Sequence, residues 1–468
     1  MKTINTDVAI IGAGTAGLAA YRAAKARGKR ALLIEGGPYG TTCARVGCMP
    51  SKLLIAAAEA AHEAAHTAPF GVHVDNVRVD GRQVMDRVKR ERDRFVGFVL
   101  EGVENIPAED KLRGHARFVS DQVLRVDDHS EIHAHSVVIA TGSLPMVPEH
   151  LKAMGERLIV NDDVFYWDDL PRRVAVFGPG VIGLELGQAL SRLGVQVRVF
   201  GVSGSVAGIS DPVVRQHAKK LFQEEFYLDP DARVLETRRV GDEVEIRYVA
   251  LDNSERTERF DYALVATGRR PNTGKLELAN TSLQLNDKGI PLYDRQTMQC
   301  GESSIFIAGD VDNDVPLLHE AADEGRIAGE NAACFPQVMP GLRRAPLMVV
   351  FSDPQIAVAG QSFRQLHAGS FVTGKVDFGN QGRSRVMLRN RGLLHVYADK
   401  TTGRFLGAEM VGPRAEHIAH LLAWAAQQEM TLARMLDMPF YHPVIEEGLR
   451  TALRDAHAQL DLPAQARA

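Results

Sequence analysis

The sequence predicts an α/β protein with two similar parallel-sheet units and a C-terminal α+β domain. The main observation is that a strand, a glycine-rich turn and a helix follow one another twice, at 7–35 and 174–200. From residue 344 onward, strand-like segments, among them residues 384–390, and then helices replace this pattern, without a glycine-rich turn. At 468 residues the chain is long enough for about three domains.

Composition narrows the class of protein. Hydrophobic residues make up 45% and charged residues 24%, as expected for a soluble globular protein. The net charge of −4 argues against a nucleic-acid surface, and no apolar run is long enough to span a membrane. The first strand begins near residue 1, which leaves no room for a signal peptide. Only four cysteines are present, so we expect a reducing cytoplasm rather than a secreted disulfide scaffold.

The first glycine-rich turn is Gly12-x-Gly14-x-x-Gly17. Its glycines permit a tight turn and let a pyrophosphate approach a helix N-terminus closely. Glu35 ends the next strand, eighteen residues past Gly17, where a carboxylate commonly binds a ribose hydroxyl. The combination predicts a Rossmann-like dinucleotide-binding unit.

Further strands of this unit follow a mainly helical stretch at 52–105. A meander of short strands begins at His115 and Ala116, and the strand at 135–143 ends in Thr141 and Gly142. Ligands of open α/β sheets bind at the carboxyl ends of strands, so we expect Thr141 and Gly142 to line the nucleotide site.

The second turn, Gly178-x-Gly180-x-x-Gly183, predicts a second dinucleotide site. Gly201 stands at the end of the following strand, where an acidic residue is expected, and no arginine replaces it. The choice between NAD and NADP is therefore open. A later strand, within 260–272, ends in an ATG sequence that contains Gly268.

A third apolar strand ends in Gly309 and Asp310. Asp310 could bind the ribityl or phosphate region of a flavin, although aspartate also commonly caps a helix.

Cys43 and Cys48, with four residues between them, lie just before an alanine-rich helix with Pro50 in its first turn. A helix N-terminus favours thiolate over thiol, and Lys52 should lie on the same helix face as Cys48. These features favour a redox-active dithiol. Two buried structural cysteines or a zinc site are alternatives, but no second Cys or His pair lies at ligand spacing.

His442 precedes a predicted helix that starts at Pro443, and Glu447 lies about one turn into it. A carboxylate so placed can orient an imidazole as a general base. Most of the sixteen histidines are expected to be surface groups or hydrogen-bonded core groups, and this is the ordinary alternative for His442 as well.

Taken together, these motifs resemble those of the pyridine nucleotide-disulfide oxidoreductases, and most closely those of the dihydrolipoamide dehydrogenases among them. The resemblance spans essentially the whole chain and keeps the family's order: GAGTAG, TTCARVGCMPSK, ATGS, GPGVIGLELG, ATGRRPN, IAGD, PLLHEAADEGR and HPVIEE. It implies FAD on the first unit, NAD on the second with NADP not excluded, and a homodimer that acts on a lipoyl-bearing carrier protein.

The resemblance also implies roles for individual residues. Cys43 and Cys48 match the redox disulfide, Lys52 and Glu185 a pair beside the flavin N5, and His442 with Glu447 the base supplied across the dimer interface. The expected FAD-binding residues are Gly12, Gly14, Gly17, Glu35, Lys52, His115, Ala116, Thr141, Gly142, Gly309 and Asp310. The expected NAD(P)-binding residues are Gly178, Gly180, Gly183 and Gly268.

The implied domains are an FAD-binding domain (1–148), an NAD(P)-binding domain (149–270), a central domain that completes the FAD site (271–343) and a dimerisation domain (344–468).

The chain departs from the family pattern at Arg45, where asparagine is usual, and at Phe440 and Tyr441, where small residues or histidine are usual. These changes could alter the entry of a lipoyl arm. The alternatives are an NAD(P)H-dependent reductase of another disulfide, such as a glutathione-like or small thiol, and a flavin redox sensor without turnover. Mercuric reductase is disfavoured because no cysteine pair follows Arg450, and soluble transhydrogenase because it lacks the redox cysteines.

Overall fold

The N-terminal strand β1 (Lys2–Ile11) lies inside a parallel sheet whose other strands come from distant parts of the chain. The parallel strands follow the order β3-β2-β1-β6-β17. The first half of β6, residues 130–133, also pairs with β5 of the antiparallel hairpin β4-β5. The strands are β2 (Ala31–Glu35), β3 (Lys111–Arg113), β4 (Ala116–Ser120), β5 (Val123–Val126), β6 (Ser130–Ile139) and β17 (Ile305–Ile307). The helices α1 (Thr15–Ala26) and α8 (Leu318–Cys334) accompany this sheet.

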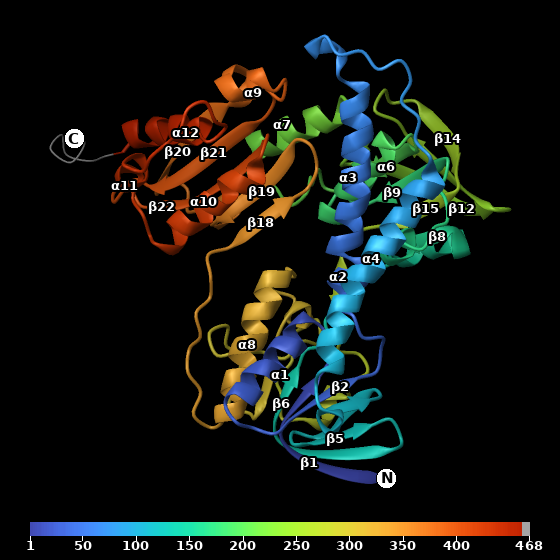
Figure 1. Ribbon diagram of the computed structural model, residues 1–468, viewed down its shortest axis with the longest axis vertical. Coiled ribbons are helices and arrows are strands. Elements are labelled where there is room, and N and C mark those ends of the chain that lie inside the picture. The colour runs from blue at the N-terminus through green and yellow to red at the C-terminus, as the bar shows by residue number, and fades with distance from the viewer. Residues whose placement is uncertain (461–468) are drawn as a thin grey trace. The chain divides into compact units, whose positions relative to one another are not determined.

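Helices α1 and α8 lie side by side because small residues face each other between them (Figure 1). A Cβ atom added at Gly325 would lie 2.2 Å from the carbonyl oxygen of Ala16, and one at Gly329 would lie 2.3 Å from that of Ala20. Gly325 and Gly329 are four residues apart on α8, and Ala16 and Ala20 are four residues apart on α1, so the contact runs along one face of each helix. The late segment of the chain is thereby packed tightly onto the first helix.

A second parallel sheet repeats the pattern of the first, in the order β11-β10-β9-β15-β8. Its strand β9 leads through a glycine-rich turn into a helix, as β1 does in the first sheet. A separate antiparallel three-stranded sheet is inserted before β15 completes the parallel sheet. The parallel strands are β8 (Leu158–Val160), β9 (Arg173–Phe177), β10 (Gln196–Phe200), β11 (Tyr227–Asp229) and β15 (Tyr262–Val265), the inserted ones β12 (Arg233–Val240), β13 (Glu243–Val249) and β14 (Glu255–Phe260), and the helices α6 (Val181–Arg192) and α7 (Pro212–Gln223).

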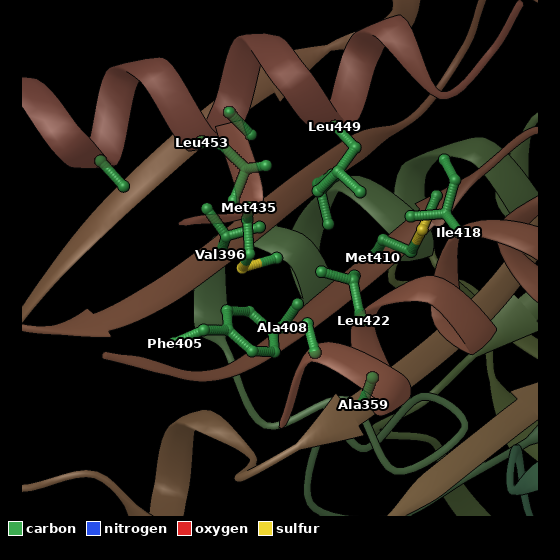
Figure 2. Close-up of a cluster of buried hydrophobic side chains, with 14 of the residues drawn as sticks. Ala359, Val396, Phe405, Ala408, Met410, Ile418, Leu422, Met435, Leu449 and Leu453 are labelled. Carbon is green, nitrogen blue, oxygen red and sulfur yellow. The ribbon is translucent and has the colours of Figure 1, made fainter. Parts of the chain in front are cut away.

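The C-terminal part forms an antiparallel sheet in the order β18-β19-β22-β21-β20, with helices packed on it. Its core includes Val396, Phe405 and Met410 from the strands and Ile418 and Leu453 from the helices (Figure 2). The elements are β18 (Leu347–Val350), β19 (Gln355–Gly360), β20 (Phe371–Asp377), β21 (Leu393–Asp399), β22 (Phe405–Gly412), α10 (Ala415–Gln427), α11 (Leu432–Leu436) and α12 (Glu447–Ala458). This is the predicted α+β domain.

The computed structural model describes residues 1–460. The chain divides into two compact units. One contains residues 1–50, 88–146 and 268–344, and the other contains 51–87, 147–267 and, of the described residues, 345–460. Two of the unit boundaries fall within helices, one in α3 (Cys48–Ala65) and one in α4 (Gly81–Glu104). The finer division at residues 148, 270 and 343 stays a prediction, and residues 461–468 of its last domain lie outside the described residues.

Two local predictions were wrong. Residues 384–390 were expected to form a strand, but α9 (Gly382–Val386) begins there because the Gln381 side chain accepts a hydrogen bond from the Ser384 N–H. The last helix begins at Glu447 instead of Pro443. The Glu447 side chain turns back and accepts a hydrogen bond from the Val444 N–H, so residues 443–446 form a turn ahead of the helix.

In the second unit, Asp211 joins the helix α7 to the C-terminal sheet. One carboxylate oxygen caps α7 by accepting the N–H groups of Val213 and Val214. The other accepts hydrogen bonds from His395 Nδ1 at 2.7 Å and from the Tyr397 hydroxyl at 2.9 Å. Burial alone would raise the pKa of Asp211, but its hydrogen bonds, led by that from His395, lower the pKa to about 2.

We expect Asp211→Asn to destabilise the second unit by about 3 kcal/mol at pH 7, because it removes the buried carboxylate that accepts hydrogen bonds from His395, Tyr397 and the first turn of α7. The lowered pKa of Asp211 means that its stabilising contribution is fully present above the unfolded value of about 4. That contribution disappears as pH falls toward the folded pKa of about 2, so variant and wild type should converge there. Urea unfolding between pH 3 and 7 measures this. Asp252→Asn is the control, since Asp252 has a similarly lowered pKa but is fully exposed; equal effects of the two changes would contradict the prediction.

Candidate active site

The first glycine-rich turn lies between β1 and α1. Gly12 has φ +109°, and a Cβ there would lie 2.3 Å from the carbonyl oxygen of Ala140. A Cβ at Gly17 would lie 1.8 Å from the carbonyl oxygen of Gly12, so neither position tolerates a side chain. A Cβ at Gly14 would meet no atom within 4 Å. The outer glycines therefore close the turn, and the middle one leaves space for a phosphate group at the N-terminus of α1.

Glu35 ends β2, as expected, and both of its carboxylate oxygens bind backbone N–H groups. One accepts from Ala13 at 2.7 Å and the other from Gly37 at 2.6 Å. The His115 ring lies against Gly36, where a Cβ would approach its Nδ1 to 2.3 Å, and Ala116 follows at the start of β4. These predicted residues therefore gather around the carboxyl end of β2.

Thr141 and Gly142 follow β6, beside the first turn. Their carbonyl oxygens accept hydrogen bonds from the side chain and the N–H of Asn272, at 3.3 and 2.9 Å. The Thr141 hydroxyl is buried, and no residue within 1–460 forms a hydrogen bond with it. A buried hydroxyl without a partner next to an open glycine is the feature expected where a ligand supplies the missing hydrogen bond.

Gly309 and Asp310 follow β17, and side chains that the sequence did not point to hold them. Asp310 accepts a hydrogen bond from the Ser143 hydroxyl at 2.8 Å. The Gly309 N–H donates to the fully buried Glu324 on α8, which is 2.8 Å from the Arg343 guanidinium. Burial, reinforced by the charge of neighbouring acidic groups, raises the pKa of Glu324 to about 8. A long-range contact of this kind leaves no signal in a single sequence.

The second glycine-rich turn, between β9 and α6, repeats the geometry of the first. Gly178 has φ +106°, and a Cβ there would lie 2.4 Å from the carbonyl oxygen of Ala266. A Cβ at Gly183 would lie 1.9 Å from the carbonyl oxygen of Gly178, while the nearest atom to one at Gly180 is 4.0 Å away. Gly268, predicted to accompany these glycines, is grouped with the first unit.

The two predicted redox cysteines lie on successive helices. Cys43 is in α2 (Thr42–Val46) and is half-buried, and Cys48 is the first residue of α3 and is exposed. At Gly47 the chain folds back so closely that a Cβ there would lie 3.1 Å from the Cα of Cys43. Gly47 therefore packs against α2, and Cys48 follows it at the N-terminus of α3, which favours the thiolate.

The predicted pair Lys52–Glu185 forms an ion pair within the second unit, with Nζ 2.7 Å from Oε2. The Glu185 side chain is 4% exposed, and its other oxygen accepts the Phe351 N–H at 2.9 Å. The Phe351 ring lies 4.8 Å from the Lys52 ammonium. Phe351 thus fixes both partners, and the sequence did not point to it.

His442 and Glu447 also meet as predicted. His442 Nδ1 lies 3.1 and 3.0 Å from the two carboxylate oxygens of Glu447, while the ring remains 80% exposed. Arg450 also contacts this carboxylate, at 3.2 Å. The hydrogen bond with His442 is the largest cause of the lowered pKa of Glu447. An ionised carboxylate therefore orients an imidazole whose Nε2 points away from it, which suits a general base.

Comparison with known proteins identifies the family. Residues 6–325 match the model of the pyridine nucleotide-disulphide oxidoreductases, and residues 347–453 match the dimerisation domain of the same family. The chain belongs to the pyridine nucleotide-disulphide oxidoreductase family. This confirms the predicted fold class: two dinucleotide-binding units and a C-terminal dimerisation domain.

Individual relatives agree with this assignment. A dihydrolipoyl dehydrogenase of Haloferax volcanii is 31% identical over 97% of both chains. Among solved structures, LpdA from Mycobacterium tuberculosis has a TM-score of 0.81 at 24% identity, covering 97% of this chain and 99% of that one. The HOCl-induced flavoprotein disulfide reductase RclA from Escherichia coli has a TM-score of 0.80 at 22% identity, covering 96% and 99%. The two solved structures show the shared fold.

As a pyridine nucleotide-disulphide oxidoreductase, the protein is an FAD-dependent flavoprotein that uses a nicotinamide nucleotide and a redox-active disulfide. The residues present fit these cofactors: Gly14 and Gly180 leave space for phosphates, and the Thr141 hydroxyl lacks a protein partner. The C-terminal match supports assembly into a homodimer.

Within residues 1–460 no helix has the length and apolar character that crossing a bilayer requires. The same residues contain no group of three or more His, Cys, Asp or Glu side chains arranged to bind a metal ion.

Proposed function

We propose that the protein is a dihydrolipoamide dehydrogenase, which oxidises a dihydrolipoyl dithiol and reduces NAD. The observation that carries this proposal is the His442–Glu447 pair. An exposed imidazole held by an ionised carboxylate is the base that a dithiol substrate needs, because its thiols are largely protonated at neutral pH. The named relative from Haloferax volcanii supports the same substrate.

The proposed reaction begins at the dithiol substrate. His442 takes a proton from one substrate thiol, and the resulting thiolate attacks Cys43 in the Cys43–Cys48 disulfide. The disulfide breaks, Cys48 leaves as a thiolate, and a mixed disulfide joins the substrate to Cys43. The second substrate thiol then attacks the substrate sulfur of the mixed disulfide, which releases the oxidised cyclic disulfide and leaves Cys43 reduced. The α3 N-terminus stabilises the thiolate on Cys48.

The electron pair now on the two cysteines leaves through the cofactors. Bound FAD supplies the two-electron chemistry that connects the dithiol with the nicotinamide. The Lys52–Glu185 ion pair, held by Phe351, keeps a positive charge at a fixed position for the flavin. Apart from Lys52, which belongs to the second unit, the residues proposed to bind FAD belong to the first unit, and Gly178, Gly180 and Gly183 would hold the pyrophosphate of NAD.

A lipoyl domain or carrier protein is the proposed partner, together with a second copy of this chain that brings His442 to the disulfide. Exposed large apolar side chains on the C-terminal domain are consistent with such an interface. They include Leu421, Trp424, Met438 and Tyr441. We place the protein in the cytoplasm, where a catalytic disulfide can cycle.

A second candidate is an NAD(P)H-dependent reductase of another disulfide. The side chains near the proposed base favour it: Tyr441 is 80% exposed directly before His442, and the Arg450 guanidinium stacks on Phe440, 5.7 Å from the ring centre. Arg45, two residues after Cys43 in α2, adds a positive charge that attracts an anionic thiol such as glutathione.

Steady-state kinetics separates the two candidates. Free dihydrolipoamide and a dihydrolipoyl carrier domain should drive NAD reduction with kcat/KM in the usual enzyme range, above about 10⁴ M⁻¹s⁻¹. Oxidised glutathione should give less than a hundredth of that efficiency with NADH or NADPH. Faster turnover of glutathione than of lipoamide would replace the proposal with the second candidate.

A further inference from the structure

The absence of an acidic residue at the end of β10 has a steric cause. A Cβ at Gly201 would lie 2.5 Å from Cγ and 2.7 Å from Cδ of Pro179, and 2.9 Å from the Cα of Pro230. Pro179 is the middle residue of the Gly178-Pro179-Gly180 turn. The ring of Pro179 therefore occupies the space of any side chain at position 201, and specificity for the ribose has to come from another residue.

Backbone N–H groups of the loop that follows β10 donate hydrogen bonds to the turn at 229–231. The Gly201 N–H donates to the carbonyl oxygen of Asp229 at 2.7 Å, and the Gly204 N–H donates to that of Pro230 at 3.0 Å. The Ser203 N–H donates to the Asp231 carboxylate at 3.1 Å. A phosphate needs such donors or a basic side chain, and these three N–H groups are already bound.

Charge at this edge is negative. Asp229 ends β11, the neighbour of β10 in the sheet, and Asp231 is exposed two residues later. The Asp231 N–H donates to the Asp229 carboxylate at 3.1 Å, which fixes the two acidic residues together. No lysine or arginine occurs from residue 201 to 214. A 2′-phosphate at the end of β10 would therefore meet the Asp229 and Asp231 carboxylates, and the loop at 201–214 supplies no cation to compensate them.

The geometry points to Asp231 as the specificity residue: its carboxylate, held against the loop at 201–204, selects NAD by excluding the 2′-phosphate of NADP. This inference rests on the proposed function, in which the second glycine turn binds the nicotinamide nucleotide. Asp231 replaces in space the carboxylate that Pro179 excludes from position 201.

Binding to the purified holoenzyme tests this without turnover. Isothermal titration calorimetry with 5′-AMP and with adenosine 2′,5′-bisphosphate should show at least tenfold tighter binding of AMP to the wild type. Asp231→Asn should shrink that ratio about tenfold by tightening the bisphosphate. Asp287→Asn, which removes an exposed aspartate of the first unit, is the control and should leave the ratio unchanged. The ratio of kcat/KM for NAD over NADP should follow the binding ratio.

The outcomes separate the inference from the proposed function. If the wild type binds the bisphosphate as tightly as AMP, or if Asp231→Asn leaves the ratio unchanged, Asp231 is not the specificity residue although nucleotide binding stands. If Arg233→Ala, which removes an exposed arginine near Asp231, abolishes tight bisphosphate binding, the site is built for NADP and the inference is overturned. If neither nucleotide binds, the nucleotide site of the proposed function falls, and the inference falls with it.

Discussion

His442→Gln should lower kcat for dihydrolipoamide oxidation by about 10²- to 10⁴-fold, the usual contribution of a positioned general base. Glutamine occupies a similar volume and can still hydrogen bond with Glu447, but it cannot accept the proton of the substrate thiol. The lowered pKa of Glu447 keeps its carboxylate ionised at neutral pH, so in the wild type it stabilises the imidazolium that proton transfer creates. Stopped-flow reduction of the oxidised enzyme by dihydrolipoamide measures this step directly.

Two further variants isolate the chemistry from local packing. Glu447→Gln should cause a smaller loss than His442→Gln, because it disturbs the orientation of the ring but leaves a base. Tyr441→Phe is the matched control, since it alters the exposed neighbour of His442 without removing a titrating imidazole. The FAD content and the number of titratable thiols should stay the same in all three. A His442→Gln enzyme that reduces at the wild-type rate would remove His442 from the mechanism.

Cys48→Ser should abolish dihydrolipoamide-driven NAD reduction while FAD stays bound. Without the sulfur of Cys48 no disulfide forms with Cys43, and the substrate thiolate has no bond to attack. Cys48 is not among the residues proposed to bind FAD, so the flavin absorbance per protein should be unchanged. Thiol titration before and after substrate reduction should show two fewer cycling thiols than in the wild type.

Cys334→Ser is the control for this experiment. Cys334 is half-buried at the end of α8 and has no assigned role in the reaction, so its replacement should preserve turnover. Undiminished NAD reduction by Cys48→Ser would show that the redox-active disulfide of the family lies elsewhere in this chain. Loss of FAD from Cys48→Ser would instead assign the cysteine a role in binding.

Local patterns carried much of the fold. The two glycine-rich turns were predictable because the contacts that exclude a side chain at their outer glycines are mostly local. These contacts lie within one strand–turn–helix unit of about thirty residues or at the end of a neighbouring strand. Lys52 and Glu185 are 133 residues apart in sequence, and their ion pair was predicted only from the family resemblance. The assigned roles of these residues stay predictions until the variants are measured.

Contacts that depend on tertiary packing were beyond the sequence. Phe351 binds Glu185 through a backbone N–H, and a backbone group has no residue signature. Residues 384–390 alternate in a strand-like way, yet one side-chain cap from Gln381 favours a short helix. From the sequence, Gly201 was interpreted as a position where an expected acidic residue is missing. In the structure, the ring of Pro179 fills the space that a side chain at position 201 would need.

The origin of the first unit's strands and helices has a consequence for biosynthesis. Strand β17 and helix α8 complete the first sheet and cover α1, but they are translated only after residue 300. The second parallel sheet, by contrast, is encoded contiguously between residues 158 and 265. On the ribosome the second parallel sheet can therefore close before the N-terminal segment, although it is synthesised earlier, has received its last strand. Chaperone protection of a nascent chain should accordingly fall on the N-terminal segment until α8 emerges from the exit tunnel.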